Sequence, residues 1–277
     1  MAATRLPRMP RRAGALIGAV LVGALFLVMA VSLVWTPYDP LAIDLDATLA
    51  APSAAHWLGT DEFGRDVLSR AMAGARVSAL IAAGTVAGAI GLGAAIGLVA
   101  GFVRGWTDRL LMSVNDAVLA FPGVLLAIAL MAAFGGGAGG LMLALGLAYL
   151  PAVIRVVRGA VLSVRESAYV EASRVMGNSE LYSMVRHVLP NMVGPIAVLA
   201  SSLFGWVILA ESALSFLGLG VAPPAPTWGN MLASARPFFS QDPWLGIAPG
   251  LLIAATLLGV NLLGDALRDA LDPKSGG

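Results

Sequence analysis

Long apolar runs constrain this chain more than any other feature. A hydrocarbon core about 30 Å thick needs about 20 consecutive apolar residues in a helix, because each residue advances an α-helix by about 1.5 Å. Six stretches meet this requirement with few charges, over residues 13–35, 77–103, 110–134, 135–154, 189–210 and 245–264. Since a backbone in lipid must satisfy its own hydrogen bonds, we expect an all-α integral membrane protein with six transmembrane helices.

The composition agrees with a membrane protein and excludes other classes. Apolar residues make up 58% of the 277-residue chain, charged residues 12%, and the mean hydropathy is +0.86. A net charge of +1 gives no basic field for nucleic acid. The absence of cysteine excludes disulfides, thiolate metal sites and cysteine nucleophiles.

The first apolar run could be mistaken for a secretory signal, because four arginines precede it. At 23 residues it is longer than the apolar region of a signal peptide, and Thr36-Pro37-Tyr38 behind it is a poor cleavage site. We therefore expect an uncleaved transmembrane helix.

Basic residues are distributed unevenly between the two sets of connections. One set carries 13 lysines and arginines and the other carries 4. Basic connections stay in the cytoplasm, so we expect both termini there, together with the connection 155–188. The predicted divisions are a cytoplasmic tail (1–12), a first helix (13–35), an external loop (36–76), a five-helix core (77–267, with an external loop 215–244) and a second cytoplasmic tail (268–277).

Small residues recur at close to four-residue spacing in the second run. Gly84, Gly88, Gly93, Gly97 and Gly101 form this series. Glycines on one face let two helix backbones approach closely in lipid, so we expect a packing helix. In the external loop before it, Asp61 and Glu62 are adjacent carboxylates, which we interpret as solvated loop charges rather than a metal site.

The connection 155–188 contains a charged stretch between two apolar runs. Ser163-Val-Arg-Glu166 has the form of a capping box and predicts a helix starting near residue 164. Gly177-Asn178 predicts a left-handed cap and turn, and Ser179 predicts the start of a second helix that ends at Leu189-Pro190. One apolar face is expected on the first helix, formed by Ala168, Ala172, Val175 and Met176.

Periodicity alone leaves two uses for this pair of helices. It is either a knob that another protein grips and moves, or an interfacial pair that lies on lipid. The residues do not decide between them.

A resemblance bears on this choice. Glu171-Ala172-Ser173, followed by Gly177 and Leu189-Pro190, resembles the EAA loop of permease subunits in bacterial ABC importers. The sequence departs from that pattern at Ser173, where alanine is usual, and at His187, where isoleucine is usual. The resemblance implies the fold of a type I importer permease with a cytoplasmic two-helix coupling elbow. The implied ATPase-coupling residues are Glu171, Ala172, Ser173, Gly177, Leu189 and Pro190.

Three further stretches narrow the family. Residues 56–70, 211–220 with 228–232, and 261–273 are similar to the shorter permease of dipeptide, oligopeptide and nickel importers, so that the resemblance extends from about Tyr38 to Pro273. It implies a place in the bacterial plasma membrane, beside a paralogous permease that completes the pathway. Two cytoplasmic ABC ATPases and an external solute-binding protein are the other implied partners. The expected cargo is a di- or oligopeptide, with nickel or a metal chelate as the alternative.

The source of energy is predicted to lie outside this chain. A Walker A loop needs a Gly-Lys-Ser/Thr sequence, and the only Lys-Ser pair, Lys274-Ser275, follows Pro273 instead of glycine. We therefore expect no cofactor here and place ATP and Mg²⁺ on the partner ATPases. An ion-coupled secondary transporter remains a weaker alternative, because Asp116 is the only plausible buried carboxylate in a span. A membrane enzyme is a third class, but the sequence shows no evident nucleophile with a base beside it.

Four polar residues are candidates for lining a transport pathway: Asn115, Asp116, Ser201 and Ser202. The first two lie shortly before Phe121-Pro122-Gly123, where a helix is prone to kink. The two serines are equally open to interpretation as helix-packing residues.

Overall fold

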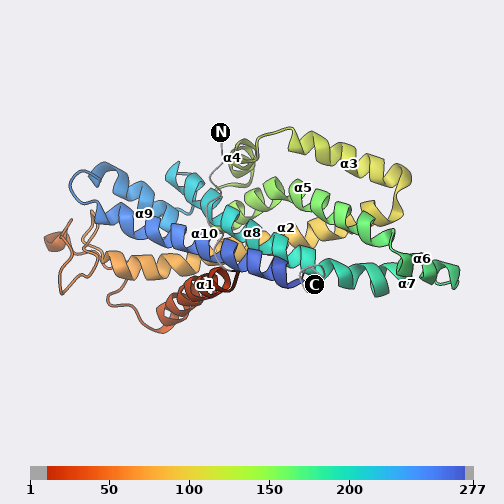
Figure 1. The fold of residues 1–277 in the computed structure, drawn as a ribbon. Coiled ribbons are helices and arrows are strands. Elements are labelled where there is room, and N and C mark those ends of the chain that lie inside the picture. Colours follow the sequence, from red (N-terminus) through yellow and green to blue (C-terminus); the bar gives the residue numbers. More distant parts are fainter. Residues whose placement is uncertain (1–10, 272–277) are drawn as a thin grey trace, which may run out of the picture.

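A computed structural model of the protein describes residues 11–271 (Figure 1), so the outer parts of both predicted tails, 1–10 and 272–277, lie outside the described residues. No strand occurs in the described range. Five helices are long and apolar enough to cross a membrane, and a sixth span results if one bent pair counts as a span. The five are α1 (Arg11–Val34), α2 (Val67–Val103), α5 (Ala138–Arg165), α8 (Leu189–Phe216) and α10 (Trp244–Leu271). The predicted all-α membrane architecture is confirmed.

The predicted span over 110–134 is sharply bent. This segment forms α3 (Gly105–Leu119) and α4 (Gly123–Phe134), which meet at an angle of 92°. Pro122 caps α4 and has no N–H to continue α3, and proline also disfavours helical geometry at Phe121 before it. The chain therefore turns at this point instead of crossing the membrane in one line.

The predicted packing role of the glycine series is confirmed, and its partner is α5. A Cβ added to Gly97 would lie 2.8 Å from the carbonyl oxygen of Ile154, and one added to Gly101 would lie 3.0 Å from that of Arg158. Such contacts allow only glycine at these positions without a shift of backbone. Gly88 is an exception, because nothing lies within 4 Å of an added Cβ there.

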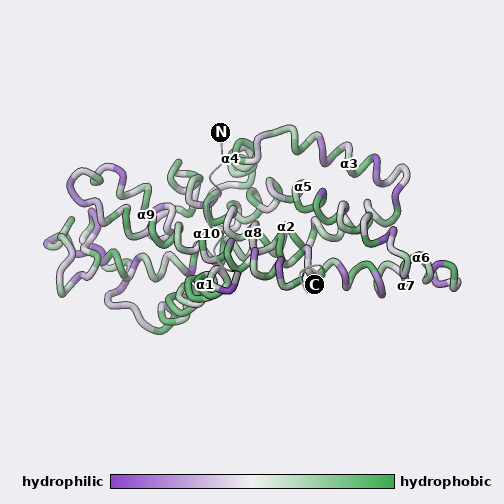
Figure 2. The backbone as a smooth tube through the Cα atoms, viewed as in Figure 1, coloured by the Kyte–Doolittle hydropathy of each residue, from purple (hydrophilic) through white to green (hydrophobic). Residues whose placement is uncertain are grey.

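Helix α1 crosses α10 at another pair of glycines. A Cβ on Gly18 would lie 3.0 Å from the carbonyl oxygen of Gly259, and one on Gly259 would lie 2.8 Å from Cβ of Leu21. Elsewhere α1 is largely uncovered, and only 17% of its most apolar window is buried within the chain. In Figure 2 the backbone of α1 has the colour of hydrophobic residues along most of its length.

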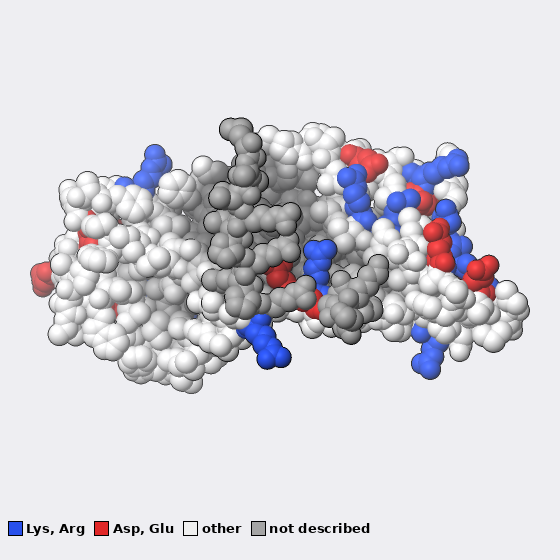
Figure 3. All heavy atoms as spheres, viewed as in Figure 1, with Lys and Arg blue, Asp and Glu red and all other residues white. Residues whose placement is uncertain are grey.

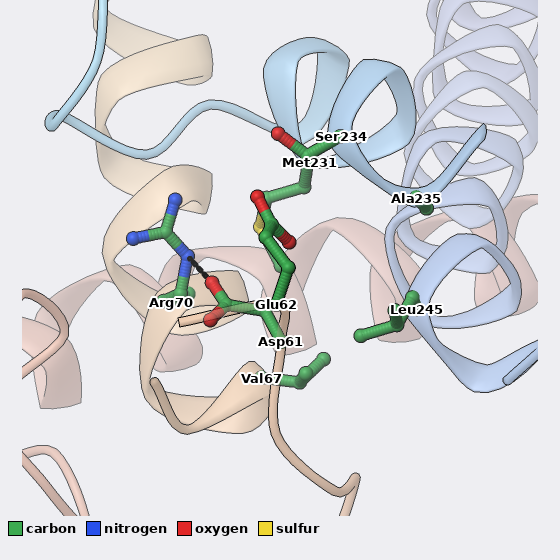
Figure 4. A pocket seen from close by; sticks show the side chains of 8 residues that line it. All are labelled: Asp61, Glu62, Val67, Arg70, Met231, Ser234, Ala235 and Leu245. Atoms are coloured by element: carbon green, nitrogen blue, oxygen red, sulfur yellow. Dashed lines mark ion pairs between the residues drawn. The ribbon is translucent and has the colours of Figure 1, made fainter. Parts of the chain in front are cut away.

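Asp61 is buried in the loop before α2, so the prediction of solvated carboxylates is wrong there. Its Oδ2 accepts from Nε of Arg65 at 2.7 Å and lies 3.2 Å from Nε of Arg70, and both arginines are buried. Asp61 and Arg70 line a small pocket against α9 (Trp228–Ala235), as Figure 4 shows. The loop charges therefore fix the start of α2 through internal pairing.

Candidate functional site

The charged stretch of the sequence forms an elbow at one end of the molecule, opposite α9 (Figure 1). It consists of α6 (Ala168–Val175), α7 (Glu180–Ser183) and a π-turn, η2 (Met184–Val188), and we call these elements with their connections the elbow. Figure 3 shows basic and acidic side chains gathered over this end of the molecule.

The first helix of the elbow begins later than predicted. Helix α5 continues to Arg165, so Ser163 lies inside its last turn and cannot act as the expected cap. Helix α6 starts after Ser167, whose side chain makes no capping hydrogen bond. The capping-box pattern at Ser163 does not start a helix, because α5 extends past the end of the apolar run and already includes Ser163.

The turn of the elbow agrees with the sequence. Gly177 has φ of +84°, in the left-handed region that favours glycine, and Asn178 N donates to the carbonyl oxygen of Ser173 at 3.2 Å. Ser179 caps α7, because its hydroxyl accepts from Tyr182 N at 3.2 Å. The predicted glycine turn and serine cap are both confirmed.

The second helix of the elbow does not end at Leu189-Pro190. It passes through η2, where Leu189 N donates to the carbonyl oxygen of Met184, and continues as α8. Residues Glu180–Phe216 thus form one continuous helical segment of 37 residues. Pro190 lies in the first turn of α8 and brings no N–H of its own, and the wider π-turn precedes it directly. The elbow is therefore joined to α8 without a flexible break.

A buried hydroxyl connects the two halves of the elbow. Ser173 Oγ lies 3.1 Å from Ser183 Oγ, and Asn178 Nδ2 donates to Ser173 Oγ at 3.2 Å. Both serines are fully buried. From the sequence, Ser173 was noted only as a departure from the alanine usual at this position. The signal that was missed is the second serine, Ser183, which could have predicted this bond.

The apolar face of α6 points away from the body of the protein. Val175 and Met176 are 83% and 73% exposed, and Leu181 on α7 is 65% exposed. The residues that α6 turns inward are Val170 and Ser173. The elbow therefore presents an uncovered apolar tip at its end, which is the arrangement of an interaction surface rather than of a packed helix.

Beside this tip lies a polar cleft with a volume of about 580 Å³. Glu171 lines it together with residues of α5 and α6 and the residues that directly follow α2 and α5: Arg104, Arg165, Glu166, Arg174 and Val175. Nη1 of Arg165 donates to the carbonyl oxygen of Phe102, and the guanidinium of Arg174 lies 5.9 Å from the centroid of its ring. The cleft is thus built where the elbow meets the end of α2.

The pathway candidates fall into two separate places. Asn115 and Asp116 lie on α3, which packs on α5 and α2, whereas Ser201 and Ser202 lie on α8. Ser201 Oγ donates to the carbonyl oxygen of Val198 and lies 2.6 Å from the position of a Cβ added to Gly264 on α10. For Ser201 the structure therefore supports a packing role.

The α3–α5 contact is polar. Nη2 of Arg155 donates to Oδ1 of Asp116 at 2.5 Å, and Nε of Arg158 donates to Oδ1 of Asp108 at 2.5 Å. Asn115 is only 4% exposed, and neither its side-chain oxygen nor its nitrogen has a partner among the described residues. An unpaired buried amide is costly, so this position has capacity for a further hydrogen-bonding group.

Glu211 of α8 is fully buried, whereas the side chain of Asp116 is 59% exposed, so the expectation that Asp116 is the only plausible buried carboxylate in a span is wrong. The Glu211 carboxylate accepts from Ser215 Oγ at 2.8 Å and from Ser78 Oγ at 3.3 Å. Ser78 Oγ also accepts from Trp228 N at 3.2 Å. These bonds tie α8 to α2 and to the beginning of α9, so Glu211 belongs to a closed structural network.

Comparison with known proteins gives a family and a fold. The model of the family described as "Binding-protein-dependent transport system inner membrane component" matches residues 93–276. The glutathione transport system permease protein GsiD of Pectobacterium atrosepticum is 43% identical over 261 residues, which cover 92% of this chain and 87% of that protein. The protein of the same name from Escherichia coli O6:K15:H31 is 42% identical over 258 residues, covering 92% and 85% of the two chains.

A solved structure of the MetNI methionine ABC transporter, in inward-facing conformations, contains a similar chain. The match has a TM-score of 0.55 at 16% identity and covers 70% of this chain and 94% of that chain. This likeness concerns the fold.

Proposed function

The chain belongs to the family of inner-membrane components of binding-protein-dependent transport systems, and we propose that its elbow is the part that a separate ATPase grips and moves. It is a multi-pass permease subunit of an ABC importer. In this proposal the elbow and both termini lie in the cytoplasm, and α9 lies on the external side.

The continuity of the elbow with α8 carries the proposal. A helical segment from Glu180 to Phe216 transmits a displacement of the elbow along its length, because no loop intervenes to absorb it. The exposed apolar tip at Val175 and Met176 gives a partner a surface to bind. The cleft around Glu171 adds charged groups beside that surface.

The proposed roles of the EAA residues follow from their positions. Glu171 is the polar contact with the ATPase, Gly177 forms the turn, and Ser173 holds the two helices together. Ala172 is exposed on α6, and Leu189 with Pro190 joins the elbow to the membrane helix. ATP and Mg²⁺ are bound by the two partner ATPases in this scheme.

Asn115 and Asp116 are proposed to line the pathway in the cytoplasmic half. Charged and unpaired polar groups at membrane depth face water or a protein interior, and broken helices occur at membrane depth only where they are buried or line a cavity. The α3–α4 break lies a few residues beyond both. Ser201 and Ser202 stay weaker candidates, since Ser201 packs on Gly264.

The proposed cargo is a small peptide. The relatives are named for glutathione transport, and glutathione is itself a tripeptide, which favours di- and oligopeptides over the nickel alternative. A paralogous permease would complete the pathway, and an external binding protein would deliver the peptide.

A nucleotide-dependent cross-link tests the elbow. The chain has no native cysteine, so Val175→Cys provides a single attachment point for a bifunctional thiol reagent in the assembled complex. We expect cross-linking to the ATPase that changes with bound nucleotide. The matched control is Leu217→Cys, which is 60% exposed beyond the other end of α8 and is expected to give no such product. Equal cross-linking from both positions would refute the proposal.

A further inference from the structure

An apolar groove opens between α1 and α2. Its volume is about 730 Å³, and its floor is formed by α8 and α10. The walls include Phe26 and Met29 of α1 and Ala83 and Ala87 of α2. The hydroxyl of Ser201, which also lines the groove, is already bonded to the carbonyl oxygen of Val198. Among the described residues, the groove lining therefore offers surface for a hydrocarbon and no polar group in need of a partner.

Arg76 lies near one end of this groove. Nη1 of Arg76 on α2 donates to the carbonyl oxygen of Ser32 on α1 at 3.3 Å. Ala79, which lines the groove, is one turn beyond Arg76, and Met29 is one turn before Ser32. A guanidinium has five N–H donors, so Arg76 keeps donors for a further acceptor where α1 and α2 meet.

The position of Arg76 corresponds to a membrane surface. Helix α1 ends at Val34, two residues beyond Ser32. Since α1 is apolar over the length needed to cross the hydrocarbon core, its end marks the boundary with the headgroups. A guanidinium at that level can bind lipid phosphate in a bidentate manner.

The groove extends through about half of the membrane. On α2 its lining runs from Ala79 to Ile90, which corresponds to roughly 16 Å of helix, about half of a core of about 30 Å. Deeper along α1, Gly18 lies against Gly259 of α10, and the space closes. A partner's transmembrane helix would need the full depth, whereas an acyl chain of one leaflet needs only this half.

We propose that the groove binds one phospholipid of the leaflet at the Arg76 end, with an acyl chain between α1 and α2 and its phosphate on Arg76. The bound lipid fills the gap beside α1, whose most apolar window is only 17% buried within the chain. It thereby holds the first helix against the rest of the permease.

Photochemical labelling of the assembled complex in lipid nanodiscs tests the site. The probe is phosphatidylglycerol with a diazirine in one acyl chain, and labelled peptides are identified by mass spectrometry. We expect labelling of α1 and α2 around Phe26 and Ala83, and a several-fold decrease in Ala87→Phe, which fills the groove. Leu92→Phe is the matched control, because Leu92 is exposed on the same helix outside the groove lining and its labelling pattern should not change. Equal labelling in the two variants would overturn the proposal.

Competition between the labelled lipid and unlabelled lipids tests the contact between the lipid phosphate and Arg76. Unlabelled phosphatidylglycerol should displace the probe several-fold better than an uncharged glycosyl diacylglycerol, and Arg76→Gln should remove that preference. An equal effect of the two competitors on the wild-type protein would refute the phosphate contact.

A disulfide from Ala83→Cys to an engineered cysteine in the partner permease would show that a protein helix occupies the groove, and the lipid proposal would then be wrong. Both readouts are independent of transport, so a failure of the elbow mechanism would leave them unchanged.

Discussion

Ser173 and Ser183 lie with their hydroxyl oxygens 3.1 Å apart, on two different helices of the elbow and without exposure to solvent. Asn178 donates to the same Ser173 oxygen. The three side chains close the turn around Gly177 from inside. The elbow is therefore a small folded unit with an internal polar contact, and its apolar residues remain free to bind a partner.

Removing one hydroxyl should weaken this unit. Ser173→Ala leaves Ser183 Oγ and Asn178 Nδ2 without their buried partner, which costs about 1–3 kcal/mol. Hydrogen exchange of residues 168–188 in the assembled complex should become faster, while exchange in α2 stays unchanged. The double variant Ser173→Ala with Ser183→Ala should lose less stability than the sum of the two single variants, because neither serine then remains as an unpaired buried hydroxyl. Strict additivity would contradict the contact.

Gly177 is expected to tolerate no side chain without strain. Its φ of +84° costs an alanine about 1–2 kcal/mol, and Gly177→Ala should increase local exchange and reduce the ATP hydrolysis stimulated by loaded binding protein. Gly159→Ala is the control, since Gly159 lies inside α5 with nothing within 4 Å of an added Cβ. If both variants behaved alike, the special backbone geometry would have no bearing on coupling.

Charge reversal at Glu171 should uncouple transport from ATP hydrolysis. Glu171→Lys adds a fourth positive group to a cleft that already contains Arg104, Arg165 and Arg174, and it removes a carboxylate from the surface proposed for the ATPase. We expect normal insertion and loss of at least tenfold in stimulated ATPase rate. Asp46→Lys, an exposed change in the loop before α2, should retain that rate. A normal rate in Glu171→Lys would remove this residue from the mechanism.

The apolar runs and glycine spacings were sufficient to predict the membrane class and the packing role of α2, but not that its partner is α5. Both depend on local pattern, since run length sets the span and glycine spacing sets a face. Hydropathy predicted one span over 110–134, because it is insensitive to a lost N–H. The stretch Phe121-Pro122-Gly123 indicated a kink but not its angle of 92°. The sequence reasoning also missed the burial of Asp61, which depends on Arg70 of α2 folding back over the loop.

In the elbow, the turn could be predicted and its orientation could not. Gly177 and Ser179 act on the backbone within a few residues of their own positions, so their roles can be predicted from the local sequence. Periodicity predicted that Val175 and Met176 share a face, but it contains no information on whether that face points toward the protein or away from it. The orientation belongs to the tertiary structure, in which the elbow connects α5 to α8 at one end of the molecule (Figure 1).

A side chain at the α2–α5 crossing should prevent assembly. In Gly97→Val the added Cβ lies 2.8 Å from the carbonyl oxygen of Ile154, and backbone cannot move away as a flexible side chain could. We expect loss of folded protein from the membrane, measured by fluorescence-detected size-exclusion chromatography. Gly88→Val, on the same helix with open space around it, should give near wild-type yield. Comparable losses for both would mean that glycine content, rather than this contact, governs folding.

Variants of the ion pair between Asp116 and Arg155 can distinguish a structural role of Asp116 from a role in the transport pathway. Both side chains are 59% exposed, so the pair itself is worth no more than about 1 kcal/mol, and Asp116→Asn should change the melting temperature of the complex little. If the pair faces the cargo, however, peptide uptake into proteoliposomes should decrease several-fold in Asp116→Asn. The exchanged variant, Asp116→Arg with Arg155→Asp, restores an ion pair with reversed polarity. Restored uptake in the exchanged variant would show that the pair only joins α3 to α5, whereas persistent loss with intact assembly would show that the positions of the two charges matter to the cargo.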